Sequence, residues 1–104
     1  MTKVFVLYPN TEGTHLNWHY YLDKHVPLVE KLLKPRGLVE ISIDKVIGGP
    51  EPNQPAAYHC IFSMTFNTLE EFQQAFQTSA QELMADIPNY TDTRPVVQIS
   101  EIIR

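Results

Sequence analysis

Hydrophobic positions divide the chain into four segments typical of strands and two typical of helices. Residues 38–47 and 58–66 alternate between apolar and polar side chains, which is the period of a strand with one buried face. Residues 3–8 and 96–103 are short apolar runs, each bounded by a proline, and we expect strands there as well. Two segments of helical spacing lie between these strands, at about residues 17–34 and 68–87.

Both helical segments carry recognisable start signals. Asn17 can cap the first helix, whose inner face consists of Trp18, Tyr21, Leu22, His25, Leu28, Val29 and Leu32. Pro27 lies inside this pattern and removes a backbone donor, so we expect a kink or a break there. The second helix begins with the capping box Thr68-Leu69-Glu70-Glu71, and its inner face is Phe72, Ala75, Phe76, Ser79 and Leu83.

The order strand, helix, strand, strand, helix, strand predicts an α+β, ferredoxin-like fold over residues 1–104 as a single domain. Right-handed crossovers at both helices give an antiparallel sheet in the order 4-1-3-2, with both helices on one face. The other face is not consistently polar, because Val4 and Val6 alternate with Phe5 and Leu7. We therefore expect a homodimer that packs sheet against sheet; the alternative is a monomer with a partly apolar sheet.

Composition narrows the class of protein. The 104 residues carry a net charge of −4, which argues against nucleic-acid binding. No apolar run is long enough to cross a membrane, and the N-terminus lacks the features of a signal peptide. Cys60 is the only cysteine, which excludes an internal disulfide and suits a reducing compartment. We expect a cytoplasmic protein without membrane or nucleic-acid partners.

Tyr21 and His25 are the strongest candidates for chemistry. They are four residues apart, so they share one face of the first helix. An imidazole can transfer protons near neutral pH, and a tyrosine hydroxyl can orient or stabilise an oxygen. The alternative is that both are structural, with Tyr21 in the core and His25 bonded to a loop carbonyl. Further candidates for the wall of a pocket are Tyr8, Trp18, His59, Phe62, Phe72 and Phe76, all of which also fit structural roles.

Motifs for metals and cofactors are missing. His15 and His19 are four apart, but no third ligand stands at a convincing position, so we expect no metal site. The four glycines do not form a phosphate loop or a dinucleotide fingerprint, so we expect no NAD or FAD and no other cofactor.

Three segments of the chain resemble the EthD family. They are Asn17-x-x-Tyr20-Tyr21-x-x-x-His25-x-Pro27-Leu28-Val29, Phe66-x-Thr68-x-x-Glu71-Phe72-x-x-Ala75, and Asp86-Ile87-Pro88-Asn89-Tyr90-Thr91-Asp92-x-x-Pro95. Asn17 stands where an acidic cap is usual in the family, and either residue can cap. The resemblance implies a dimeric α+β barrel linked to the catabolism of ethyl tert-butyl ether and related compounds.

The resemblance does not select a reaction, because relatives of this fold include monooxygenases, cyclases and haem-degrading enzymes. The leading hypothesis is a pocket between helices and sheet that binds a small hydrophobic, oxygen-bearing molecule. There His25 would act as general base or acid and Tyr21 would hold an oxygen, in cofactor-independent chemistry of an oxidoreductase or lyase type. The alternatives are a non-catalytic accessory or ligand-binding dimer, and a structural dimer without a pocket.

Overall fold

The computed structural model describes residues 1–104 and contains one four-stranded antiparallel sheet. Its strands are β1 (Thr2–Pro9), β2 (Leu38–Lys45), β3 (Tyr58–Phe66) and β4 (Val96–Glu101). They lie in the order β2-β3-β1-β4, which is the predicted order 4-1-3-2 counted from the opposite edge. The α+β, ferredoxin-like fold predicted from the sequence is therefore confirmed.

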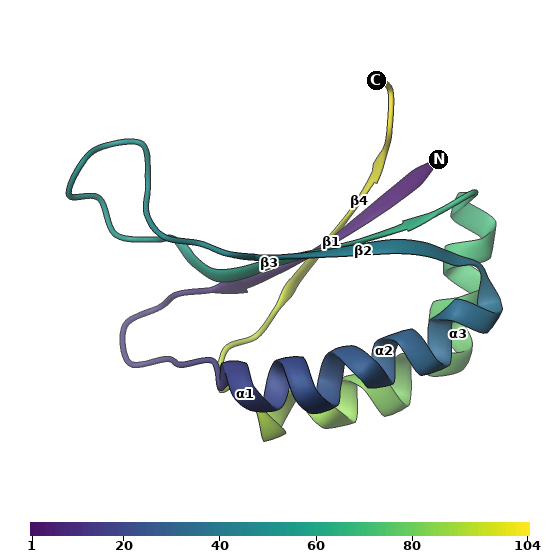
Figure 1. The fold of residues 1–104 in the computed structure, drawn as a ribbon, viewed down its shortest axis with the longest axis horizontal. Helices are drawn as coiled ribbons and strands as arrows, with labels where there is room; N and C mark the ends of the chain where they lie inside the picture. The colour runs from purple at the N-terminus through teal and green to yellow at the C-terminus, as the bar shows by residue number, and fades with distance from the viewer.

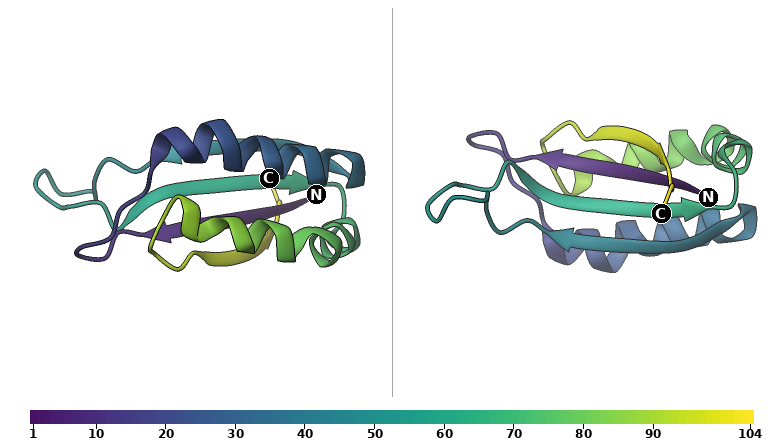
Figure 2. Two further views of the ribbon diagram at one scale, coloured as in Figure 1. Left: turned by 90° about the horizontal axis from the view of Figure 1, so that it is seen from below. Right: turned by 90° about the horizontal axis from the view of Figure 1, so that it is seen from above.

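Both helical segments cover one face of the sheet, and the other face carries no helix or loop (Figures 1 and 2). The first segment consists of α1 (Trp18–Tyr20), the π-helix η1 (Tyr21–His25), α2 (Val26–Leu33) and the 3-10 helix η2 (Lys34–Arg36). The second consists of α3 (Leu69–Asp86) and the 3-10 helix η3 (Ile87–Asn89). None of these helices has the length and apolar composition that crossing a bilayer requires.

Pro27 does not end the first helical segment, so a break, one of the two expected outcomes, is absent. The turn that precedes it widens instead into the π-helix η1, where the Val26 N–H donates to the Tyr21 carbonyl five residues back. Pro27 has no backbone N–H to donate, and this one-residue shift in the hydrogen-bond register lets the helical segment continue through Pro27 into α2. Tyr21 and His25 are the two buried residues of this widened turn.

Two strands are shorter than the sequence pattern predicts. The pattern predicts that the second strand reaches residue 47, but it ends at Lys45, opposite Cys60, and only the Val46 N–H, which donates to the His59 carbonyl at 3.2 Å, continues the pairing. The last strand was expected to reach residue 103 and ends at Glu101, which lies opposite Thr2 at the start of β1. In both cases the apolar pattern continues past the last residue of the strand.

The register of the sheet sets which side chains face the helices. Val4 lies opposite Met64 and Val6 opposite Phe62, and these side chains face the helical layer. Phe5 and Leu7 alternate with them and lie on the uncovered face. The core therefore fills the space between the sheet and the helices, where any pocket between these layers must also lie.

The capping box at the start of α3 is formed as the sequence predicts, with the Glu71 N–H donating to Thr68 Oγ1 at 3.1 Å. We expect Thr68→Ala to lower the free energy of unfolding by about 1 kcal/mol, because this donor loses its partner. Urea unfolding measures the change. Thr78→Ala, at an exposed position within the same helix, is the matched control and should not lower stability, because alanine has the higher helix propensity. Equal effects of the two substitutions would contradict the role of the cap.

Candidate active site

A cavity of about 760 Å³ lies between the sheet, the helical layer and the segment that leads into β4. Most of its lining is apolar. Its walls are formed by Val6, Tyr8, Tyr21, His25, Val29, Leu33, Phe62, Met64, Phe76, Leu83, Met84, Ile87, Pro88, Tyr90, Thr91, Asp92, Thr93, Arg94, Pro95 and Val97. The volume suits a small organic molecule.

Four buried rings gather in one part of this wall. Tyr8 comes from β1, Tyr21 and His25 come from η1, and Tyr90 directly follows η3. The ring of Tyr21 stacks on that of His25 with centroids 5.7 Å apart, and the rings of His25 and Tyr90 are 4.5 Å apart. The Asn17 N–H donates to the Tyr90 carbonyl at 2.7 Å, which ties the end of η3 to the start of α1. Segments distant in sequence thus form one polar corner.

A chain of hydrogen bonds runs through this corner. The hydroxyl oxygens of Tyr8 and Tyr90 are 2.9 Å apart, and the Tyr90 hydroxyl lies 3.3 Å from His25 Nε2. On the other side of the imidazole, His25 Nδ1 lies 2.9 Å from Asp86 Oδ2. The imidazole is therefore held between a carboxylate and the hydroxyl of a tyrosine that lines the cavity.

Asp86 is ionised and fixes the tautomer of His25. Burial raises the pKa of Asp86, but hydrogen bonds from Tyr20, Asn89 and His25 outweigh it, so that the pKa lies below its ordinary value. The Tyr20 hydroxyl donates to Asp86 Oδ1 at 2.6 Å, and the Asn89 amide donates to the same oxygen at 3.0 Å. An ionised carboxylate only accepts, so Nδ1 of His25 carries the proton and Nε2 offers a lone pair.

Burial sets the protonation states of the other groups in the corner. It lowers the pKa of His25 below 6.5, against the opposing effect of Asp86, so the imidazole is neutral at pH 7. Burial also raises the pKa of Tyr8 to about 12 and raises the pKa values of Tyr21 and Tyr90 further. The corner therefore combines one neutral base with three protonated phenols that can donate hydrogen bonds.

The structure brings together five of the eight site residues proposed from the sequence. Tyr8, Tyr21, His25, Phe62 and Phe76 all line the cavity. Tyr8 and Tyr21 are also in ring contact, with centroids 5.6 Å apart. The spacing of Tyr21 and His25 on one helical face indicated that these two side chains would lie together, and they do so although the turn between them is a π-helix.

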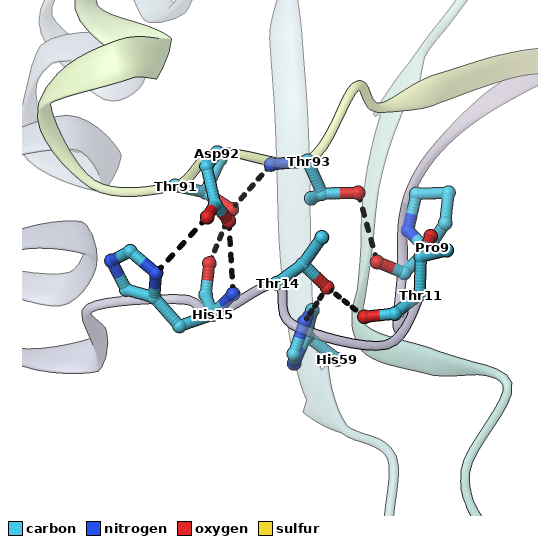
Figure 3. Close-up of polar contacts among 8 residues, drawn as sticks. All are labelled: Pro9, Thr11, Thr14, His15, His59, Thr91, Asp92 and Thr93. Atoms are coloured by element: carbon cyan, nitrogen blue, oxygen red, sulfur yellow. Dashed lines mark hydrogen bonds and ion pairs between the residues drawn. The ribbon is translucent and has the colours of Figure 1, made fainter.

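The other three proposed site residues lie outside the cavity wall. Trp18 packs its ring against the edge of Tyr21 and lies under the Lys45 ammonium. The His59 imidazole contacts the Thr14 hydroxyl at 3.0 Å, on the loop before α1 (Figure 3). Phe72 is buried in the core, where its ring lies against those of Phe66 and Phe76. These three side chains therefore pack against other residues of the fold and do not line the cavity.

Asp86, Tyr90 and Arg94 belong to the site and were not among the residues proposed from the sequence. Asp86 and Tyr90 are separated from His25 by 61 and 65 residues, so no local spacing connects them. The available signal was the segment 86–95, which carries part of the resemblance to the EthD family. It contains all three residues, but it assigns no role to any of them.

Polar contacts hold the segment that carries these residues against the loop before α1 (Figure 3). The Thr91 hydroxyl donates to the His15 carbonyl at 2.6 Å, and the His15 N–H donates to Asp92 at 2.9 Å. The Thr93 hydroxyl donates to the Pro9 carbonyl at 2.9 Å. This part of the cavity wall is therefore anchored to β1 and to the loop that follows it.

Two histidines considered as metal ligands each lie beside one carboxylate. His15 Nδ1 lies 3.4 Å from Asp92 Oδ2, and His19 Nε2 lies 3.2 Å from Asp23 Oδ2. No third His, Cys, Asp or Glu side chain joins either pair in an arrangement that could hold a metal ion. Both pairs are largely exposed, and we assign them no ligand.

Comparison with known proteins shows that the EthD domain family matches residues 17–94. An EthD-like protein from Ralstonia eutropha JMP134 is 34% identical, with 99% of this chain and 92% of that chain covered and a TM-score of 0.92. An ethyl tert-butyl ether (EthD) family protein from Bacillus halodurans C-125 is 21% identical, with 99% of each chain covered and a TM-score of 0.70.

A dimeric ferredoxin-like protein from an uncultured marine organism shares the fold at lower identity. It is 12% identical, with 99% of this chain and 94% of that chain covered and a TM-score of 0.59. At these identities, the likeness to this protein and to the one from Bacillus halodurans shows the fold alone. No curated protein matches this sequence.

Proposed function

This chain belongs to the EthD family, and from that premise we propose that its cavity binds a small hydrophobic, oxygen-bearing organic molecule in a catabolic pathway. We propose further that His25 transfers a proton to or from this molecule without a cofactor. The observation that carries the proposal is the hydrogen-bonded series Asp86–His25–Tyr90, which ends in the wall of the cavity.

The geometry supports a general base at His25. Asp86 accepts the Nδ1 proton, which leaves the lone pair of Nε2 on the side of Tyr90 and the cavity. A neutral imidazole can take a proton from a substrate carbon or hydroxyl directly, or through the Tyr90 hydroxyl. Asp86 then lies in contact with the imidazolium that forms and stabilises its charge. The proton returns to the substrate, or to water, when the imidazole regains its neutral form.

The tyrosines support the role of oxygen binding. Burial keeps the phenols of Tyr8, Tyr21 and Tyr90 protonated at neutral pH, and a phenol that exchanges its present partner for the ligand can donate a hydrogen bond to a substrate oxygen. Removing a proton next to a carbonyl places negative charge on the carbonyl oxygen. Donors fixed by packing in an apolar pocket stabilise such charge strongly, because they need little reorganisation. Tyr21 keeps the role proposed from the sequence, and Tyr8 and Tyr90 share it.

The uncovered face of the sheet supports assembly as a homodimer. Leu7 lies opposite both Ile61 and Val96 on this face, and Phe5 lies on the same side of β1. These side chains form an apolar patch on a face that no element of the chain covers (Figures 1 and 2). A second copy packed sheet to sheet would remove the patch from water. The marine relative with this fold is itself described as dimeric.

A pH profile of proton exchange tests the proposed chemistry. β-Tetralone is a small apolar ketone with acidic protons next to its carbonyl, and NMR in D₂O follows the loss of their signal. We expect the wild-type protein to accelerate exchange above the buffer rate. Since only neutral His25 accepts a proton, the acceleration should be complete at pH 7 and decrease as the pH falls through a value below 6.5. No acceleration, or one independent of pH between 5 and 7, would contradict the proposal.

A ligand-binding dimer without catalysis is the second candidate function. The observation that favours it is that the polar groups of the corner already bond to one another, with no buried side-chain polar atom left unpaired. Mass spectrometry under native conditions distinguishes this function when combined with the exchange assay. A dimer that retains a small molecule and returns it unchanged, without accelerating exchange, would support binding alone.

A further inference from the structure

Arg94 carries the one charge in the cavity wall that is available to a ligand. It is exposed, lines the cavity and takes part in no ion pair. The wall also contains Asp92, but that carboxylate accepts from the His15 N–H at 2.9 Å and lies 3.4 Å from the His15 imidazole. Asp92 and Arg94 carry opposite charges, and the guanidinium is the one that no ion pair or side-chain hydrogen bond already engages.

The backbone on either side of Arg94 is held in place. The Thr93 hydroxyl donates to the Pro9 carbonyl, and the Thr93 N–H donates to the Thr91 hydroxyl at 3.2 Å (Figure 3). Pro95 follows Arg94 and restricts the backbone there. The base of the arginine side chain is therefore fixed relative to the cavity, which reduces the entropy lost when the guanidinium binds a ligand.

The chemistry of the wall points to a particular ligand group. Thirteen of the twenty lining residues are hydrophobic, so the cavity offers little solvation to a doubly charged group such as a phosphate. One guanidinium balances one negative charge, and its planar fork matches the two oxygens of a carboxylate. We propose that the ligand is a small apolar monocarboxylate whose carboxylate binds Arg94 while its reacting part lies at His25. This assignment rests on the proposed function and names its substrate class.

A matched pair of probes tests the assignment on the full-length protein. Naphthylacetate and naphthylacetamide have nearly the same shape, but only the first carries a negative charge at pH 7. Isothermal titration should show that the wild-type protein binds the acid about ten-fold more tightly than the amide, the range expected for a charge-assisted hydrogen bond. Arg94→Gln should abolish this preference by weakening the binding of naphthylacetate while leaving the binding of naphthylacetamide unchanged. Thermal unfolding of this variant should match that of the wild type, because the side chain is exposed.

Two further variants separate this assignment from the proposed proton transfer. Arg36→Gln removes an exposed arginine outside the cavity wall and should retain the preference for the acid. His25→Gln should lose proton exchange and still prefer the acid. Three results would overturn the carboxylate assignment alone. They are equal affinity of the wild type for both probes, no binding of either probe at millimolar concentration, and an unchanged preference for the acid in Arg94→Gln. A clear preference without any proton exchange would overturn the proposed proton transfer alone.

Discussion

Replacing His25 with glutamine is expected to lower the acceleration of β-tetralone exchange by about 10²–10⁴-fold, the contribution typical of general acid–base groups. Glutamine can preserve a hydrogen bond to Asp86, but its amide has no basic nitrogen to accept a proton at neutral pH. The fold should persist, because Asp86 keeps its bonds to Tyr20 and Asn89. NMR measurement of the exchange rate at pH 7, together with a circular dichroism spectrum, provides the test.

His19→Gln is the matched control for this substitution. His19 is on the same helical segment, is highly exposed, pairs with Asp23 and does not line the cavity. Its replacement should leave the exchange rate within the error of the wild-type value. Equal rates for the two variants would show that His25 is not the base and that exchange, if any, arises elsewhere on the protein.

Replacing Leu7 with lysine is expected to separate the proposed dimer into monomers. Leu7 is in the middle of the uncovered apolar patch, opposite Ile61 and Val96. Twofold symmetry would place two such leucines in the interface, and each contributes about 1.5–3 kcal/mol when fully buried. Their loss should raise the dimer dissociation constant by about 10²–10⁴-fold. Analytical ultracentrifugation should then show particles of 12.0 kDa in place of particles of twice that mass.

Leu22→Lys makes the same chemical change on the opposite side of the molecule. Leu22 is an exposed residue of η1, in the helical layer, so its replacement should leave a sheet-to-sheet dimer intact. If the wild-type protein sediments at 12.0 kDa at every accessible concentration, the sheet face is not a dimer interface. Dissociation by both substitutions would indicate a general loss of stability instead.

Local patterns along the sequence were sufficient for most of the fold. Asn17 and Thr68 cap the helices that they were predicted to begin, because capping involves residues only three positions apart. The strand order followed from the order of elements and the handedness of crossovers. The π-helix before Pro27 could not be predicted in this way, since a proline in a helix can be accommodated by a kink, a break or a wider turn.

The candidate site was predictable only in part, for a physical reason. Tyr21 and His25 are one turn apart, so local spacing was enough to place them together. Asp86 and Tyr90 reach the same imidazole through packing of the second helical segment against the first, and no local period encodes such a contact. Trp18 shows the converse limit: it shares the inner face with Tyr21, yet contacts with Tyr21 and Lys45 place it outside the cavity wall.

The distorted turn of the first helical segment coincides with the polar corner. Tyr21 and His25 belong to the π-helix, and both point into the polar corner. The wider turn that precedes Pro27 therefore carries the proposed base and the tyrosine that stacks on it. A π-turn at a functional site is a recurring arrangement in proteins.

The protonation state of His25 is the most direct test of this account, and ¹⁵N NMR of the imidazole reads it at each nitrogen. His25→Gln identifies which signals belong to this residue. The account predicts that at pH 7 the proton is on Nδ1, beside Asp86, and that the ring titrates with a pKa below 6.5. A proton on Nε2 at pH 7, or a pKa above 6.5, would contradict the assignment of His25 as a neutral base facing the cavity.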